Sequence, residues 1–310
     1  MTLKIRDERQ LRALTGLSQV QFDKLLVTFT QVYEAERQRA YMRTKLAGTR
    51  KRKPGGGQKG KLPRMEDKLL FVLYYYKTYP TFDVLGTHFD LSRSKAHENL
   101  HKLSPILHAT LVEMGMMPKR EFKTPDELKA ALGGIDQILI DATERKIRRS
   151  KDDATQREHY SGKKKRHTVK NTVISTIDKV ILFVGRTFTG RNNDYKMLKE
   201  ELPPDLDWFS EINVLVDLGY LGIQSDYAGD GIDIPHKKPR KSKKNPDPKL
   251  ADEQKAANRI LSQARIFVEN AIGGIKRYNI LVHAFRNHKE NFQDDVIAVS
   301  AALWNLSLSY

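Results

Sequence analysis

The sequence predicts an α/β protein in which an all-helical region precedes a domain built on a mixed β-sheet. Before residue 115, apolar residues recur at helical spacing. After residue 125, short apolar runs typical of buried strands appear, the first of them at 137–141. With 310 residues, of which 39% are hydrophobic, the chain can hold one large domain and one or two small ones.

The first part of the chain is expected to contain long helices. A stripe of leucine and phenylalanine side chains predicts helices over 7–41, with a break at Gly16 and a second start capped by Ser18. Another helix is expected over 64–79, where the leucines and tyrosines suit core packing.

Two further helices are expected within 63–115, each with its own N-terminal cap. Thr81 and Ser92 predict where they begin, and only a short turn separates them. This is the pattern of a helix-turn-helix, whose second helix enters the major groove of DNA. An ordinary helical bundle is the alternative. The side chains that the second helix would offer to DNA are Arg93, Ser94, Lys95, His97 and Asn99.

The charge of the chain indicates a polyanionic partner. Lys and Arg total 55 against 38 acids, which gives a formal net charge of +17 and favours nucleic acid as the partner. Basic residues gather in 43–62, where Arg50, Lys51, Arg52 and Lys53 lead into a run of glycines. We expect a flexible arm that lies on DNA phosphates or enters a minor groove, and a solvated linker is the alternative.

The composition also excludes several classes of protein. There is no cysteine, so disulfides, thiol catalysis and cysteine-ligated zinc are ruled out. No apolar run is long enough for a membrane span, and residues 1–7 lack the apolar core of a signal peptide. We therefore expect a cytoplasmic protein that is located near DNA and has no membrane partner.

Beyond residue 125 the chain is expected to alternate strands and helices. A short helix begins after Thr124, and a hairpin turn is expected at 178–179. The predicted strands are 138–141, 167–177, 180–188, 214–217 and 231–235, and the predicted helices are 193–202, 251–278 and 292–308. Three strands followed by alternating helices and strands are the order of an RNase-H-like fold, a mixed sheet with helices on both faces.

Three carboxylates stand out on this framework. Asp141 and Asp217 each end an apolar run, which predicts a side chain at the C-terminal edge of a buried strand. Glu269 lies in a helical segment, and an RNase-H-like sheet would bring the three acids to one edge. Taken singly, an acid at the end of a strand is more often a helix cap or a turn residue than a catalytic group. Three carboxylates without cysteine favour a hard cation, Mg²⁺ or Mn²⁺.

The helix around Glu269 carries two basic residues on the same side. Arg265 and Lys276 lie four residues before and seven residues after Glu269, so they are suited to grip DNA phosphates beside it. The apolar residues 266–268 are expected to face the sheet.

The stretch 157–170 resembles the signature of the DDE transposases of bacterial insertion sequences, in the branch shared by the insertion-sequence-five group and Harbinger-like elements. Residues 141–144, 190–194 and 217–220 follow in that family's order. The signature contains the basic run Lys163, Lys164, Lys165 and Arg166, which is expected to hold the substrate backbone, with a solvated hairpin as the alternative.

The helix signature of that family is also similar to the segment around the third acid. Arg265, Glu269 and Lys276 match its arginine, glutamate and lysine, while Ser262 stands where the family has tyrosine. The chain leaves no room for a large inserted domain between Asp217 and Glu269. Asp194, within the family's third stretch, is expected to cap a helix, with an auxiliary role left open.

The resemblance implies a DNA transposase that binds the terminal inverted repeats of its insertion sequence and performs metal-dependent strand cleavage and strand transfer. Asp141, Asp217 and Glu269 would be both catalytic and metal-binding, with two Mg²⁺ or Mn²⁺ ions per site. The implied partners are double-stranded DNA, as transposon ends and target, and a second copy in a homodimer. The alternatives are an RNase-H-like nuclease without strand transfer and a DNA-binding regulator derived from a transposase.

We accordingly assign four segments. Residues 1–42 form N-terminal helices for dimerisation or end binding, and 43–62 form the basic arm. Residues 63–115 form the helix-turn-helix domain, and 125–310 form the RNase-H-like DDE catalytic domain.

Overall fold

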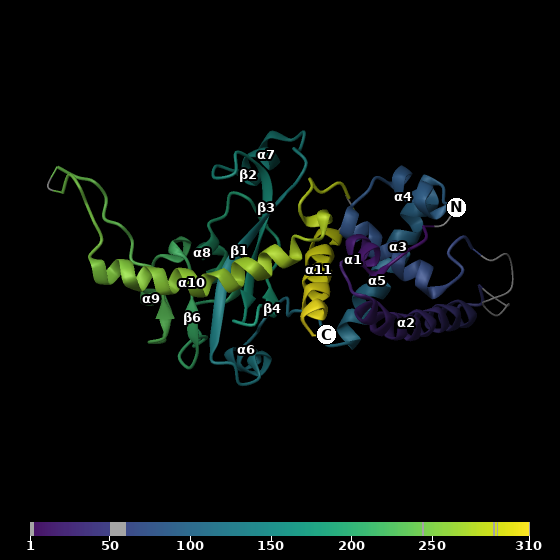
Figure 1. Ribbon diagram of the computed structural model, residues 1–310, viewed down its shortest axis with the longest axis horizontal. Helices are drawn as coiled ribbons and strands as arrows, with labels where there is room; N and C mark the ends of the chain where they lie inside the picture. Colours follow the sequence, from purple (N-terminus) through teal and green to yellow (C-terminus); the bar gives the residue numbers. More distant parts are fainter. Residues whose placement is uncertain (1–2, 50–59, 244, 288, 290, 310) are drawn as a thin grey trace. The chain divides into compact units, whose positions relative to one another are not determined.

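The computed structural model describes residues 3–49, 60–243, 245–287, 289 and 291–309, and it divides into two compact units (Figure 1). The helical unit comprises Met1–Met117, Arg277–His283 and Asp295–Tyr310, and the sheet unit comprises Pro118–Lys276 and Ala284–Asp294. The predicted arm residues Arg50, Lys51, Arg52 and Lys53 lie outside the described residues. The four segment boundaries given above stay a prediction.

The helical unit is built from long helices that bury an apolar stripe. Its elements are α1 (Glu8–Thr15), α2 (Gln19–Leu46), α3 (Met65–Thr78), α4 (Phe82–Phe89), α5 (Arg93–Glu113), the short 3₁₀ helix η2 (Asn279–Leu281) and most of α11 (Phe292–Leu308). The predicted break between the first two helices is confirmed, because Gly16 adopts φ 85° and the Ser18 side chain caps α2.

The expected pair of capped helices is present in α4 and α5. Thr81 and Ser92 each accept a backbone N–H in the first turn of the helix that follows, at 3.4 and 3.3 Å. The turn between them approaches α4 closely at Gly86, where an added Cβ would lie 2.4 Å from the carbonyl oxygen of Leu91. Glycine at this position therefore permits the tight turn.

The sheet unit combines a mixed sheet with helices. Its helices are α6 (Pro125–Leu132), α7 (Asp153–His159), α8 (Asp194–Glu201), the 3₁₀ helix η1 (Leu218–Tyr220), α9 (Ile223–Asp226) and α10 (Asp252–Ile275). Its strands are β1 (Gln137–Lys146), β2 (Tyr160–Ser161), β3 (Arg166–Ser175), β4 (Ile181–Val184), β5 (Phe188–Thr189), β6 (Asn213–Leu215) and β7 (Ile232–Asp233).

The strand order confirms the mixed sheet that the sequence predicted. The order is β2-β3-β1-β6-β7, in which β1 pairs antiparallel with β3 and parallel with β6, and β6 pairs parallel with β7. The short strands β2, β5 and β4 follow one another along the edge of β3 that β1 leaves free. This is the order expected for an RNase-H-like sheet.

Two strand predictions need correction. The predicted strand 180–188 is two strands, because the carbonyl oxygen of Gly185 accepts a hydrogen bond from the Asn171 side chain at 2.9 Å and the regular ladder stops there. The predicted strand 138–141 is longer, since β1 continues to Lys146 through its antiparallel pairing with β3. Asp141 therefore lies within a strand and not at its end.

The two faces of the sheet carry different layers. Ile138 and Ile140 of β1 belong to a buried cluster that includes Leu128 of α6 and Leu198 of α8. Because strand residues alternate, Leu139 and Asp141 point to the opposite face. There α10 crosses the sheet, as Figure 1 shows, and contacts β1, β3 and β6. The sheet thus lies between two helical layers.

The prediction that residues 266–268 of α10 face the sheet is wrong for two of the three. Val268 is 1% exposed, but Ile266 is 49% and Phe267 37% exposed. Three consecutive helical residues span more than half a turn, so they cannot share a face. The buried stripe continues from Val268 to Ala271, Ile272 and Ile275, at the spacing of a helix face.

Candidate active site

The register of two parallel strands brings Asp141 and Asp217 together. The last parallel pair between β1 and β6 joins Leu139 to Leu215. Each aspartate lies two residues beyond its member of that pair. Both side chains therefore point to the same face, from neighbouring segments of the chain. Neighbouring strands lie about 4.8 Å apart. The strand register therefore brings the two acids near each other, with Asp141 in β1 and Asp217 at the N-cap of η1, just beyond β6.

The surroundings of Asp141 disfavour its negative charge. Burial is the main reason that the pKa of Asp141 rises to about 6, and the charges of Asp217 and Asp194 raise it further. A hydrogen bond from the backbone N–H of Ala142, 2.7 Å long, and the charge of Arg265 act in the opposite direction. The result is a partly buried carboxylate whose negative charge is disfavoured by burial and by two neighbouring carboxylates.

Asp217 is held by the turn that follows β6. Its Oδ1 accepts the backbone N–H of Gly219 at 2.7 Å, and an added Cβ at Gly219 would lie 2.7 Å from the same oxygen. Glycine therefore lets the chain turn back against the carboxylate. The next residue, Tyr220, is fully buried, and its hydroxyl has no hydrogen-bond partner in the described part of the chain.

The Tyr220 hydroxyl was not predicted as a site residue, although it lies in one of the stretches that carry the family resemblance. Burial raises the pKa of Tyr220 well above its ordinary value, and the charges of Asp141, Asp194 and Asp217 add to that rise. The group stays neutral and is available as a hydrogen-bond donor beside the acids.

Glu269 is held differently from the two aspartates. Its side chain is 59% exposed on α10, whereas that of Asp217 is 30% exposed. Arg265 links the two, with one guanidinium nitrogen 3.7 Å from Asp217 Oδ2 and 3.6 Å from Glu269 Oε1. The predicted arrangement of Arg265 and Glu269 on one helix side is present. The structure thus brings the third acid to the site through an arginine.

The donor set fits a hard divalent cation in part. Asp141 and Asp217 offer carboxylate oxygens in a place with excess negative charge, which is what Mg²⁺ or Mn²⁺ needs. Glu269 does not join them, and the described residues contain no group of three His, Cys, Asp or Glu side chains placed to hold a metal ion. The two aspartates therefore form the core of the candidate site, and Glu269 stands beside it.

An ion pair next to the acids was not predicted. Asp194 was expected to cap a helix, but Asn193 is the cap of α8 and Asp194 is its first residue. The Asp194 carboxylate is 2.9 Å from Lys170 Nζ, which also donates to the Asn192 carbonyl oxygen at 2.8 Å. Neighbouring Asn and Asp residues can both cap a helix, so the sequence could not assign the two roles.

The predicted recognition residues lie on the first turns of α5. Arg93, Ser94, Lys95 and His97 are exposed, and Asn99 is half-buried. Lys95 pairs with Glu98 at 2.7 Å and Arg93 approaches Asp83 at 4.0 Å, both at the surface. Exposed pairs of this kind are weak and exchange readily for phosphate contacts. The helix presents the predicted residues to solvent.

The predicted basic run forms the turn of a hairpin between β2 and β3. Lys163, Lys164, Lys165 and Arg166 are all exposed, and Lys165 adopts φ 54° in the turn. Lys276 follows the end of α10 and is half-buried. Burial lowers its pKa, and the neighbouring charge of Lys164 lowers it further, while Asp141 and Glu144 act against this. Lys276 thus lies near Asp141, and Lys164 lies near Lys276.

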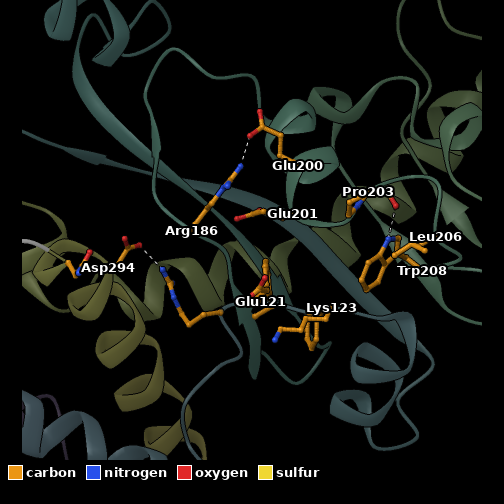
Figure 2. Close-up of a pocket in the computed structure, with 13 residues that line it drawn as sticks. Glu121, Lys123, Arg186, Glu200, Glu201, Pro203, Leu206, Trp208 and Asp294 are labelled. Atoms are coloured by element: carbon orange, nitrogen blue, oxygen red, sulfur yellow. Dashed lines mark hydrogen bonds and ion pairs between the residues drawn. The ribbon is translucent and has the colours of Figure 1, made fainter.

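A separate cavity of about 740 Å³ lies elsewhere in the sheet unit, and none of the predicted site residues lines it (Figure 2). Glu201 is part of its lining, and burial raises the pKa of this carboxyl to about 7. Arg120 and Arg186, also in the lining, are paired with Asp294 and Glu200 respectively. No pattern in the sequence singles out this cavity.

Comparison with known families agrees with this geometry. Residues 140–305 match the model of the DDE superfamily endonucleases, and residues 60–113 match the helix-turn-helix of that superfamily. The chain belongs to the DDE superfamily endonucleases. The resemblance and the fold class predicted from the sequence are thereby confirmed. Members of this superfamily generally use divalent metal ions.

Similar proteins support the same family. A probable transposase for insertion sequence element IS702 from Microchaete diplosiphon is 31% identical over 258 residues, which are 81% of this chain and 84% of that protein. A putative transposase for insertion sequence element IS112 from Streptomyces albus G is 25% identical over 226 residues, 73% of each chain. No solved structure matches the chain. No described helix is both long and apolar enough to span a membrane.

Proposed function

We propose that this DDE superfamily endonuclease is a DNA transposase that binds the terminal inverted repeats of its element, cleaves them and transfers the strands. The observation that carries the proposal is the register that sets Asp141 and Asp217 side by side on one sheet face. The match to a helix-turn-helix at residues 60–113 and the net charge of +17 support DNA as the substrate. The two relatives are each described as a transposase.

The acids are the proposed catalytic and metal-binding residues. Asp141 and Asp217 would hold the metal from the sheet, and Glu269 would contribute a further carboxylate from α10. When bound, two ions of Mg²⁺ or Mn²⁺ activate water or a 3′-hydroxyl and stabilise the leaving oxygen. The strand register brings the two aspartates near each other, and Gly219 fixes the orientation of the Asp217 carboxylate.

In this proposal Arg265 first links two acids and then binds a DNA phosphate. In the structure its guanidinium lies between Asp217 and Glu269. When Glu269 turns toward the site, Arg265 is released and becomes available for a DNA phosphate, as its planar guanidinium suits phosphate well. Lys276 and the hairpin residues Lys163, Lys164, Lys165 and Arg166 would hold the backbone of the same DNA. The first turns of α5 would read the terminal repeats, on a homodimer that holds two ends.

A gel assay tests this function and separates it from its alternatives. Duplexes that carry the DNA flanking the gene are incubated with the protein and Mg²⁺. A transposase cleaves the ends and joins them to target DNA, a nuclease only cleaves, and a regulator only binds. Binding without any cleavage by the wild-type protein would refute the proposed activity.

A further inference from the structure

The segment between β7 and α10, together with the first half of α10, stands out from the sheet unit as an arm. We define the arm as residues 235–264 in their described part, and it is distinct from the basic arm predicted at 43–62. In Figure 1 it reaches beyond the sheet at one end of α10. No residue of α10 before Val268 is buried, and Ile260 is 67% exposed. This half of the helix therefore contributes no fully buried side chain to the core of the unit.

The base of the arm is fixed to the helix. The backbone N–H of His236 donates to Asn258 Oδ1 at 2.7 Å, and Asn258 Nδ2 donates to the His236 carbonyl oxygen at 2.9 Å. Two reciprocal hydrogen bonds tie the start of the loop to the second turn of α10. The loop is thus carried by the helix.

The loop carries a strong positive charge. Its exposed basic residues without an ion pair in the described chain are Lys237, Lys238, Arg240, Lys241 and Lys243. The loop's acid, Asp247, is already paired with Lys249 at 2.9 Å. Five unpaired cations on a short exposed segment repel one another, so a polyanion is the partner that this surface fits.

The arm is also placed at a defined distance from the acids. Asp252 begins α10 and Glu269 lies on the same helix, 17 residues further on, so their separation along the axis is about 25 Å. In B-DNA this corresponds to about seven base pairs. A continuous helix transmits this spacing without a hinge.

We infer that the arm is a second DNA-binding surface, which grips the duplex backbone about seven base pairs from Glu269, the acid that stands beside Asp141 and Asp217. This inference rests on the proposed function, because it takes DNA as the substrate of the acidic site. It adds a contact that the helix-turn-helix and the hairpin do not provide. The contacts of the arm would be to phosphates, so its binding would not depend on the DNA sequence.

The test compares two triple variants of the full-length protein. In the first, Lys237, Lys238 and Lys241 become Gln; in the second, the same three become Arg and the charge is kept. Binding to a terminal-repeat duplex and to an unrelated duplex is measured as a function of salt, and hydroxyl-radical footprints are recorded on the terminal repeat. Thermal unfolding checks that both variants fold.

The Gln variant is expected to bind both duplexes about tenfold to a hundredfold more weakly at 0.1 M salt, with a salt slope lower by about 2.7. Its footprint should lose protection about seven base pairs from the cut, while the Arg variant keeps all three properties. An unchanged slope and footprint in the Gln variant would overturn the inference, and so would a change confined to the oligomeric state. A wild-type protein that binds through the arm but never cuts terminal repeats would refute the proposed function and not the arm.

Discussion

Asp141 and Glu201 are two partly buried acids of the same unit, and both have a raised pKa. The pKa of Asp141 is about 6 and that of Glu201 about 7, in each case mainly because of burial. Their neighbours differ. Asp141 lies among further carboxylates, while Glu201 lies near Arg120 and Arg186, whose charges are already matched by other acids.

This comparison shows that a raised pKa does not by itself identify a catalytic acid. Burial raises both values, so burial cannot discriminate between them. What differs is the sign of the neighbouring charges: Asp217 and Asp194 add to the rise in the pKa of Asp141, whereas Arg186 and Arg120 act against the rise at Glu201. Glu201 needs no cation, since its proton removes the charge at low cost. The proposed metal site therefore includes Asp141 and not Glu201.

The largest expected effect separates the two acids in catalysis. Replacing Asp141 by Asn should lower DNA cleavage about 1,000-fold or more, because the metal is worth several kcal/mol in the transition state. Replacing Glu201 by Gln should leave cleavage within about threefold of wild type at pH 7, since Glu201 touches no reacting group. Rates of nicking of a terminal-repeat duplex measure both. Equal losses of cleavage rate in the two variants would contradict the different roles given to Asp141 and Glu201.

A smaller effect is expected from the turn that holds Asp217. Replacing Gly219 by Ala places a methyl group 2.7 Å from Asp217 Oδ1, so the carboxylate must move. Disturbing the support of a metal ligand typically costs about tenfold to a hundredfold in activity or metal affinity. Gly162, in the hairpin turn, has open space around it, and its Ala variant is the matched control. Full activity in both variants would show that Asp217 does not need its present orientation.

The smallest effect concerns stability and belongs to Glu201. Its pKa is raised from 4.5 to about 7, so its contribution to stability is complete below about pH 4.5 and is lost as the pH rises through about 7. The Glu201→Gln variant should lack this loss and be more stable than wild type at pH 8 by up to about 3 kcal/mol. Urea unfolding from pH 5 to pH 8 measures it. Parallel curves for the two proteins would show that Glu201 is not buried in solution.

The sequence predicted the strands that carry the two aspartates better than it predicted where those strands end. An apolar run that ends in an acid indicates a buried parallel strand and its edge. Asp217 does lie just beyond β6, but Asp141 lies within β1. The length of β1 was not predictable in the same way, because residues 142–146 are mostly polar or charged and are extended only through pairing with β3. Burial requires apolar residues in the local sequence, whereas pairing with a distant strand does not, so it is harder to predict from the sequence.

Other features depended on contacts that no local pattern encodes. Glu200 and Glu201 are adjacent acids at the end of α8, and only the packing against Gly185 decides that Glu201 is the buried one. Likewise, the sequence shows that Arg265 and Glu269 share a helix side, but not that Arg265 also reaches Asp217. The catalytic roles of all three acids stay predictions until they are tested.

The central claim is that Asp141 binds a metal ion. Its most direct test measures metal binding through the change that the metal causes in thermal unfolding, without DNA. Wild type, the Asp141→Asn variant and the Glu201→Gln variant are each titrated with Mn²⁺ at constant ionic strength. At a hundred times the dissociation constant, bound metal should stabilise the wild type and the Glu201→Gln control by about 2.7 kcal/mol. The Asp141→Asn variant should show no such gain. A Mn²⁺ response that survives in the Asp141→Asn variant and disappears in the Glu201→Gln variant would contradict the account.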